Sequence, residues 1–162
     1  MRNDSSDAPS SEDLPNPRSL ALRRVSVREY SPWEMKKYLS DKGYDDETVE
    51  TVVAELIETK QIDETRYARA MTRDQAMRKR GPLYILNKLR TKGVRLGLKE
   101  IEVIFHEVAP EDEETLIMRV LERRYPQAQA SLKDRSRAYQ GLLRRGFSRG
   151  TVEKCLRKKA DK

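Results

Sequence analysis

A six-residue pattern recurs three times in the sequence, and it constrains the fold more than any other feature. The copies are Leu39–Tyr44, Leu89–Val94 and Leu142–Phe147, and in each a Leu stands four residues before a Gly. A Lys or Arg precedes the Gly, and an apolar residue follows it. The glycines lie 50 and 53 residues apart, which predicts three tandem units.

The pattern is typical of a helix C-terminus. Gly enters the left-handed backbone region without the clash that a Cβ atom would cause, so helices commonly end just before it. The apolar residue after the Gly then packs on the Leu, and the basic residue faces the negative end of the helix dipole. Three evenly spaced copies therefore predict the same turn in three repeats.

Each turn lies between two helices with recognisable starts. Ser31-Pro32-Trp33-Glu34 has the form of a capping box, and Gly81-Pro82 opens the corresponding helix of the second unit. Asp45 or Asp46, then Gly97, then Ser148 are candidate caps for the helices that follow the turns. A further helix precedes each pair, at about 18–29, 63–80 and 111–125, and Asp63 is the expected cap of the middle one.

The predicted fold class is therefore all-α, with three tandem three-helix repeats stacked into an elongated, curved rod. One irregular bundle of the same helices is the alternative. Residues 1–17 are rich in Ser, Asp and Pro and are expected to form a disordered acidic tail. The repeats are expected at 18–60, 61–109 and 110–162.

Composition argues against catalysis. The 162 residues are 36% apolar and 38% charged, with one His and one Cys. His106 alone would have to serve any Ser or Cys nucleophile, and a His/Cys zinc site lacks ligands. We therefore expect no enzyme activity, no cofactor and no metal. No apolar run is long enough to cross a membrane, no signal peptide is evident, and the lone Cys155 suits a reducing cytoplasm.

The net charge of +7 is strongly segregated. Residues 65–100 hold eleven Lys/Arg against two acidic residues, and residues 131–162 hold eleven against three. Residues 41–64 and 101–122 are acidic. Basic blocks attract phosphate through counterion release, so a polyanion contact is expected, while the acidic blocks suit a protein partner.

The middle block presents its cations on one helix face. Arg66, Arg69 and Arg73 are spaced i, i+3 and i+7. A helix-turn-helix DNA reader is disfavoured, because no set of base-reading side chains opens a second helix. The adjoining apolar face of the same helix is expected to comprise Tyr67, Ala70, Met71 and Met77.

Several stretches resemble the RecX regulatory proteins of bacteria. The most specific are Gln61–Ala70, Arg80-Gly81-Pro82 and Leu89–Val94. The run Tyr30–Tyr44 is similar as well, and Arg145-Gly146-Phe147 fits the closing Arg-Gly-aromatic of that family. The resemblance covers about residues 18–160.

The resemblance implies three tandem three-helix repeats and a cytoplasmic regulator of the RecA recombinase. Such a protein binds RecA and its single-stranded DNA filament, by lying in the filament groove or by capping its end. It thereby restrains the ATPase, strand exchange and co-protease activities, and hence recombination, DNA repair and the SOS response. The absence of an exposed heptad seam suggests a monomer.

On this hypothesis the basic residues contact RecA or DNA. The alternative is a general basic protein that binds single-stranded nucleic acid without direct RecA contact. The residues expected to make the contacts are Arg66, Arg69, Arg73, Arg78, Lys79, Arg80, Lys88, Arg90 and Lys92, with Arg144, Arg145 and Lys158 as secondary candidates.

Overall fold

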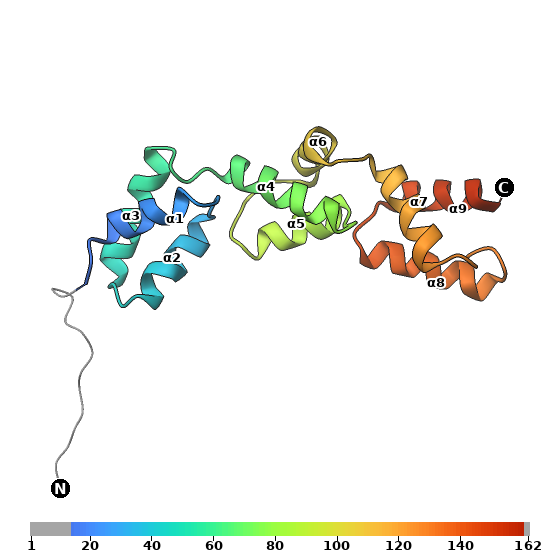
Figure 1. The fold of residues 1–162 in the computed structure, drawn as a ribbon, viewed down its shortest axis with the longest axis horizontal. Helices are drawn as coiled ribbons and strands as arrows, with labels where there is room; N and C mark the ends of the chain where they lie inside the picture. Colours follow the sequence, from blue (N-terminus) through green and yellow to red (C-terminus); the bar gives the residue numbers. More distant parts are fainter. Residues whose placement is uncertain (1–13, 161–162) are drawn as a thin grey trace, which may run out of the picture. The chain divides into compact units, whose positions relative to one another are not determined.

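A computed structural model of the chain describes residues 14–160 (Figure 1), so residues 1–13 of the expected tail lie outside the described part. Every regular element within 14–160 is an α-helix, which confirms the all-α prediction. The chain falls into two compact units, and the division lies inside one helix, between Tyr67 and Ala68.

The first unit contains α1 (Pro17–Val25), α2 (Pro32–Asp41), α3 (Asp46–Glu58) and the start of α4 (Glu64–Met77). Its three complete helices pack on one another around a core of aliphatic and tyrosine side chains. Leu14, just before α1, packs against this core. Helix α1 ends four residues earlier than expected, since the chain turns at Ser26 and Arg28 stacks on the Tyr30 ring at 3.7 Å.

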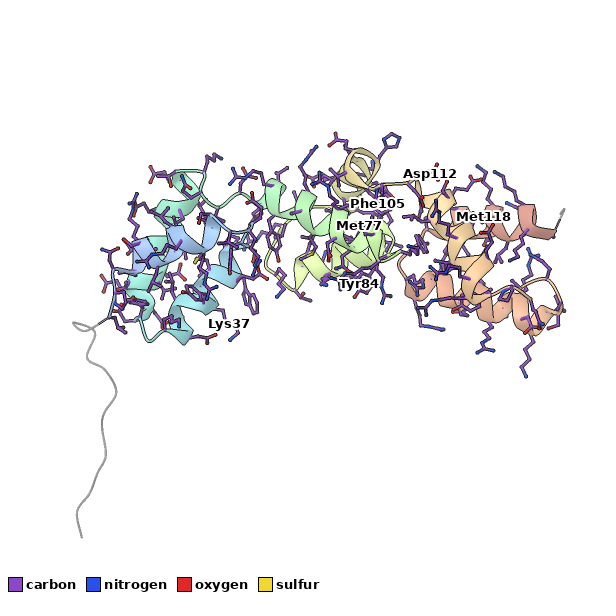
Figure 2. The ribbon with its side chains drawn as sticks, viewed as in Figure 1. Lys37, Met77, Tyr84, Phe105, Asp112 and Met118 are labelled. Carbon is purple, nitrogen blue, oxygen red and sulfur yellow. The ribbon has the colours of Figure 1, made fainter. Side chains whose placement is uncertain are left out.

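The second unit contains the rest of α4 and five further helices. These are α5 (Pro82–Arg90), α6 (Leu98–Val108), α7 (Glu113–Arg124), α8 (Leu132–Arg144) and α9 (Arg149–Ala160). Helix α5 packs on α6, and α7 packs on both α8 and α9. Phe105 of α6 is part of the buried apolar set of this unit (Figure 2), and Cys155 of α9 is buried as well.

The three predicted turns are present. Gly43, Gly93 and Gly146 have φ values of +93°, +73° and +82°. In each turn the amide of the following apolar residue donates to the carbonyl of the Leu, at 3.1–3.4 Å. All three Leu side chains are fully buried. Each helix therefore ends in the doubly hydrogen-bonded glycine turn that the sequence pattern predicts.

The predicted helix starts are confirmed as well. The side chains of Ser31, Asp45, Asp63 and Ser148 each accept a hydrogen bond from the amide three residues later. Gly97 has no side chain to accept one, and its own amide donates to the Glu100 carboxylate at 2.7 Å. The local sequence therefore predicts where these helices begin.

Helix α4 departs from the prediction in its end and in its buried face. It ends at Met77 because Lys79 takes a left-handed conformation, with φ +57°, and the Arg80 amide donates to the Gln75 carbonyl. Tyr67 is buried as expected, but Ala70 is exposed and Met77 is 57% exposed (Figure 2). Beyond Tyr67, the buried residues of α4 are Ala68, Thr72, Gln75 and Ala76. Because two of these are polar, the spacing of apolar residues alone predicts the wrong buried face.

Within the second unit, backbone hydrogen bonds join the second helix triplet (α4–α6) to the third (α7–α9). The Gly81 amide donates to the Arg145 carbonyl at 2.9 Å, and the Leu83 amide donates to the Gly146 carbonyl at 3.0 Å. The first amides of α5 and the last carbonyls of α8 lack partners within their own helices, so each end satisfies the other. The opposite dipole ends of the two helices face one another there.

We expect the backbone junction to reject any side chain at Gly146. A Cβ atom there would overlap the Tyr84 backbone, and φ is already left-handed. Gly146→Ala should lower the free energy of unfolding by at least about 3 kcal/mol, as measured by urea denaturation.

Two other glycines provide matched controls. A Cβ at Gly43 meets only Leu14 at 3.8 Å, so Gly43→Ala should cost about 1 kcal/mol from φ strain alone. Nothing lies within 4 Å of a Cβ at Gly150, inside α9, so Gly150→Ala should be neutral or stabilising by up to about 1 kcal/mol. Equal losses at Gly43 and Gly146 would contradict the backbone junction.

Candidate nucleic-acid interface

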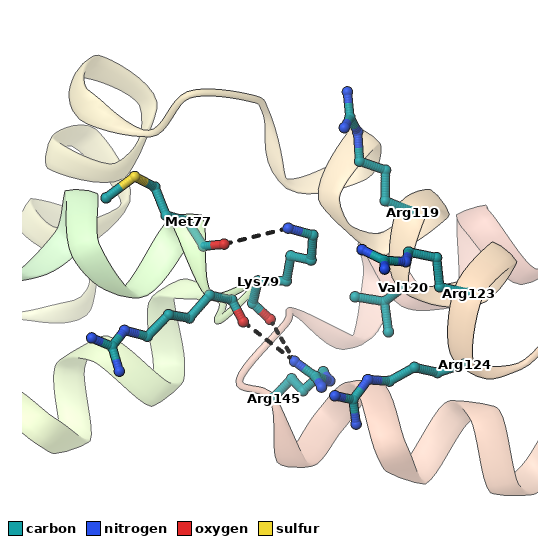
Figure 3. Close-up of a pocket in the computed structure, with 8 residues that line it drawn as sticks. Met77, Lys79, Arg119, Val120, Arg123, Arg124 and Arg145 are labelled. Atoms are coloured by element: carbon teal, nitrogen blue, oxygen red, sulfur yellow. Dashed lines mark hydrogen bonds between the residues drawn. The ribbon is translucent and has the colours of Figure 1, made fainter.

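A pocket of about 370 Å³ lies in the second unit, beside the junction between α5 and α8 (Figure 3). It is lined by the C-terminal end of α4, by α7 and by the end of α8. Two lining residues are apolar, Met77 and Val120, and no described Asp or Glu lines it. The remaining six are all cationic: Arg78, Lys79, Arg119, Arg123, Arg124 and Arg145.

Arg145 lines this pocket and also stabilises the fold through hydrogen bonds to the backbone. Its Nη1 donates to the Lys79 carbonyl at 3.1 Å and to the Arg78 carbonyl at 3.5 Å (Figure 3). These carbonyls lie just beyond α4, where helical partners have run out. Arg145 thus caps the end of α4 with its side chain, while its own carbonyl receives the Gly81 amide.

Most of the positive charge in the pocket is not neutralised by the protein. Arg78 pairs with Asp74 at 3.1 Å, and Arg119 pairs with Glu111. Within residues 14–160, four of the lining cations form no ion pair with a carboxylate: Lys79, Arg123, Arg124 and Arg145.

Arg145 experiences electrostatic repulsion from neighbouring cations in this pocket. Burial lowers the pKa of the Arg145 guanidinium, and the charges of Arg124 and Arg80 lower that pKa further. Like charges held together in a partly desolvated site favour the approach of an anion. The pocket can therefore bind a group that carries several negative oxygens.

The basic residues predicted on α4 do not form one uniform surface. Arg66 pairs with Glu29 at 3.0 Å and donates to two backbone carbonyls, and it belongs to the first unit. Arg69 pairs with Glu107 at 2.6 Å within the second unit. Arg73 is exposed and has no ion pair with any described residue. Of the three, Arg73 is the one whose guanidinium is not paired with a described carboxylate, so its charge is the most available to a ligand.

The cations around the start of α5 and along it have varied surroundings. The Arg80 guanidinium lies 4.4 Å from the centre of the Tyr84 ring, which fixes it beside the junction. Arg90 is exposed, whereas Lys88 and Lys92 are half-buried. These residues are basic and accessible in part, but the pocket at the end of α4 does not include them.

The two remaining predicted residues lie on α8 and α9, and neither is in the pocket. Arg144 is exposed at the end of α8. Lys158 pairs with Glu114, as does Lys154 at 2.8 Å. Hydrogen bonds from Lys154 and then Lys158 lower the pKa of the Glu114 carboxyl. Lys158 is therefore tied to α7 by an ion pair.

Sequence reasoning missed the three arginines of α7. Arg119, Arg123 and Arg124 lie in and beside a block whose net charge is negative, so a segment count conceals them. Arg119 and Arg123 are spaced i, i+4 and share a helix face, which was the available signal. Their meeting with Lys79 and Arg145 depends on tertiary packing, which the sequence pattern does not reveal.

A metal site, a membrane span and a catalytic His or Cys each place specific requirements on the described residues. Within 14–160 there is no group of three or more His, Cys, Asp or Glu residues placed to hold a metal ion. No helix there is long and apolar enough to span a bilayer. His106 is exposed on α6, and burial raises the pKa of the Cys155 thiol to about 11.

Three family models match the chain in succession. They describe the first, second and third three-helix domains of RecX, and they match residues 18–56, 63–95 and 111–156. The chain belongs to the RecX family. The prediction of three tandem three-helix repeats is thereby confirmed.

Curated relatives agree with this assignment. A regulatory protein RecX from Halorhodospira halophila is 34% identical over 136 residues, covering 83% of each chain. A regulatory protein RecX from Treponema pallidum is 31% identical and covers 85% of this chain and 81% of the relative. Both relatives are named as regulatory proteins.

Solved structures share the fold. The crystal structure of RecX from Lactobacillus salivarius matches with a TM-score of 0.71 at 18% identity, covering 90% of this chain and 94% of that one. A second crystal structure of a regulatory protein RecX matches with a TM-score of 0.68 at 23% identity, covering 85% and 70%.

Arg145 should contribute to stability through its hydrogen bonds to the α4 end. Arg145→Met keeps the apolar stem but leaves the Arg78 and Lys79 carbonyls without this donor. We expect the free energy of unfolding to fall by about 1 kcal/mol in urea denaturation. Arg144→Met, at the exposed neighbouring position, should change it by less than about 0.5 kcal/mol. Equal effects would contradict the capping role.

Proposed function

We propose that this RecX family member is a regulator of the RecA recombinase. It binds RecA and the RecA–single-stranded DNA filament and restrains ATP hydrolysis, strand exchange and co-protease activity without catalysing a reaction itself. Membership of a family of regulatory proteins is the observation that carries the proposal. We infer that it acts as a cytoplasmic monomer in recombination, DNA repair and the SOS response.

The charge distribution supports contact with a filament that contains both protein and DNA. The chain carries +7 overall, in basic blocks separated by acidic ones. Basic side chains suit the DNA phosphates, and acidic segments suit cationic surfaces of a protein partner. The contact residues remain those proposed from the sequence, of which Arg73, Arg90 and Arg144 are exposed and form no ion pair within residues 14–160.

A second candidate function is general binding to single-stranded nucleic acid, with no direct contact to RecA. The cationic pocket at the end of α4 favours this possibility, because four of its cations lack carboxylate partners. Stoichiometry separates the two functions. A competitor for DNA must cover sites in proportion to strand length, whereas a protein that caps filament ends acts well below one molecule per RecA.

The proposal predicts inhibition of the single-stranded-DNA-dependent ATPase of RecA. The protein is titrated into a steady-state ATPase assay at two salt concentrations. We expect inhibition at molar ratios well below one per RecA, with weak dependence on salt if protein contacts dominate. Inhibition only at amounts that saturate the DNA would support the nucleic-acid competitor. No inhibition at any amount would overturn the regulator of RecA and leave general binding to nucleic acid.

Charge reversal on α4 should weaken inhibition. The double variant Arg69→Glu/Arg73→Glu places repulsive charge at the proposed contact, so half-inhibition should need at least about tenfold more protein. Circular dichroism should show unchanged helicity. The control is Lys99→Glu/Lys133→Glu, which makes the same charge change at exposed positions in the first turns of α6 and α8. Unchanged inhibition by the α4 variant removes these two residues from the site.

A further inference from the structure

In the cationic pocket at the end of α4, backbone carbonyls hold Arg145 and Lys79 in place. Arg145 is fixed by two backbone carbonyls, and the Lys79 ammonium donates to the Met77 carbonyl at 3.3 Å. Arg123 and Arg124 end α7, where the helix dipole favours cations. The dipole accounts for cations on α7, but it does not account for their convergence on Arg145 and Lys79.

The chemistry of the lining selects the class of ligand. Five of the six cations are arginines, whose planar guanidinium groups donate two parallel hydrogen bonds to oxyanions. A protein partner anchored there would need apolar contacts at its centre, yet only Met77 and Val120 are apolar. A phosphate group needs charge and donors alone, and both are present.

We propose that the pocket lined by Lys79, Arg123, Arg124 and Arg145 binds phosphate groups. Two sources share this chemistry, the backbone of a nucleic-acid strand and a free di- or triphosphate. Met77 is 57% exposed at the edge of the pocket and offers an apolar surface to a sugar or base. The strand source rests on the proposed function, whereas the phosphate site itself does not require RecA.

A phosphate bound there touches both helix triplets of the second unit. Lys79 follows α4, Arg123 and Arg124 end α7, and Arg145 follows α8. The bound anion relieves the repulsion between these cations and joins the two triplets by charge-assisted hydrogen bonds. Binding should therefore stabilise the fold as well as hold the ligand.

The test uses the double variant Arg123→Gln/Arg124→Gln, which leaves the backbone contacts of Arg145 intact. Its control is Arg149→Gln/Arg157→Gln, an equal loss of charge at exposed positions on α9 outside the pocket. The probes are a fluorescent oligothymidylate, followed by anisotropy over a salt series, and inorganic pyrophosphate as a competitor. A short polyglutamate peptide tests the acidic-protein alternative.

We expect the pocket variant to bind the oligothymidylate about tenfold more weakly than the control variant. The slope of log affinity against log salt should fall by about 1.4, the value for two lost contacts to a single strand. Competition by pyrophosphate in the native protein but not in the pocket variant supports the phosphate site. If pyrophosphate binding alone depends on the pocket, the ligand is a free phosphate compound.

A second measurement is independent of the variants. Pyrophosphate should raise the thermal unfolding temperature of the native protein above that in sodium chloride of equal ionic strength. Equal affinities of the pocket and control variants for both phosphate probes would overturn the proposal, as would a loss confined to polyglutamate. Because no RecA is present, either failure is distinguishable from failure of the ATPase titration.

Discussion

The hydrogen bonds between the end of α8 and the start of α5 are the interaction on which the second unit depends. Helix ends buried without partners are costly, because desolvated amides and carbonyls lose their bonds to water. Here the Gly81 and Leu83 amides and the Arg145 and Gly146 carbonyls solve this problem for one another. Side-chain caps at these two ends are therefore unnecessary, and glycine is required so that the two backbones can approach.

The cationic pocket follows from the same junction. The turn that presents the Arg145 carbonyl to Gly81 also directs the Arg145 guanidinium toward the carbonyls beyond α4. That position partly buries the guanidinium and brings it near Arg124 at the end of α7, and burial and then the Arg124 charge lower its pKa. Structure and candidate site thus share a residue, and a change at Arg145 affects both. Arg123 and Arg124 affect only the charge, which makes them the cleaner probes of binding.

Local features of the fold could be read from the sequence, and tertiary ones could not. The glycine turns at Gly43, Gly93 and Gly146 and the side-chain caps at Ser31 and Asp45 depend on a few neighbouring residues. The buried face of α4 depends on which polar residues its neighbours accept, so the prediction was wrong at Ala70 and Met77. The pocket was missed for a related reason, since its cations come from three separate segments of the sequence, the end of α4, α7 and the turn after α8.

A junction made of backbone atoms does not depend on the identity of the side chains around it, except where a glycine is required. The residues around it can therefore change in charge and length while the two helix ends keep their positions. In this chain glycines form the junction, and of the pocket arginines Arg145 alone also donates to the backbone beyond α4. The charge of the proposed site can therefore change at Arg123 and Arg124 while the backbone frame stays the same.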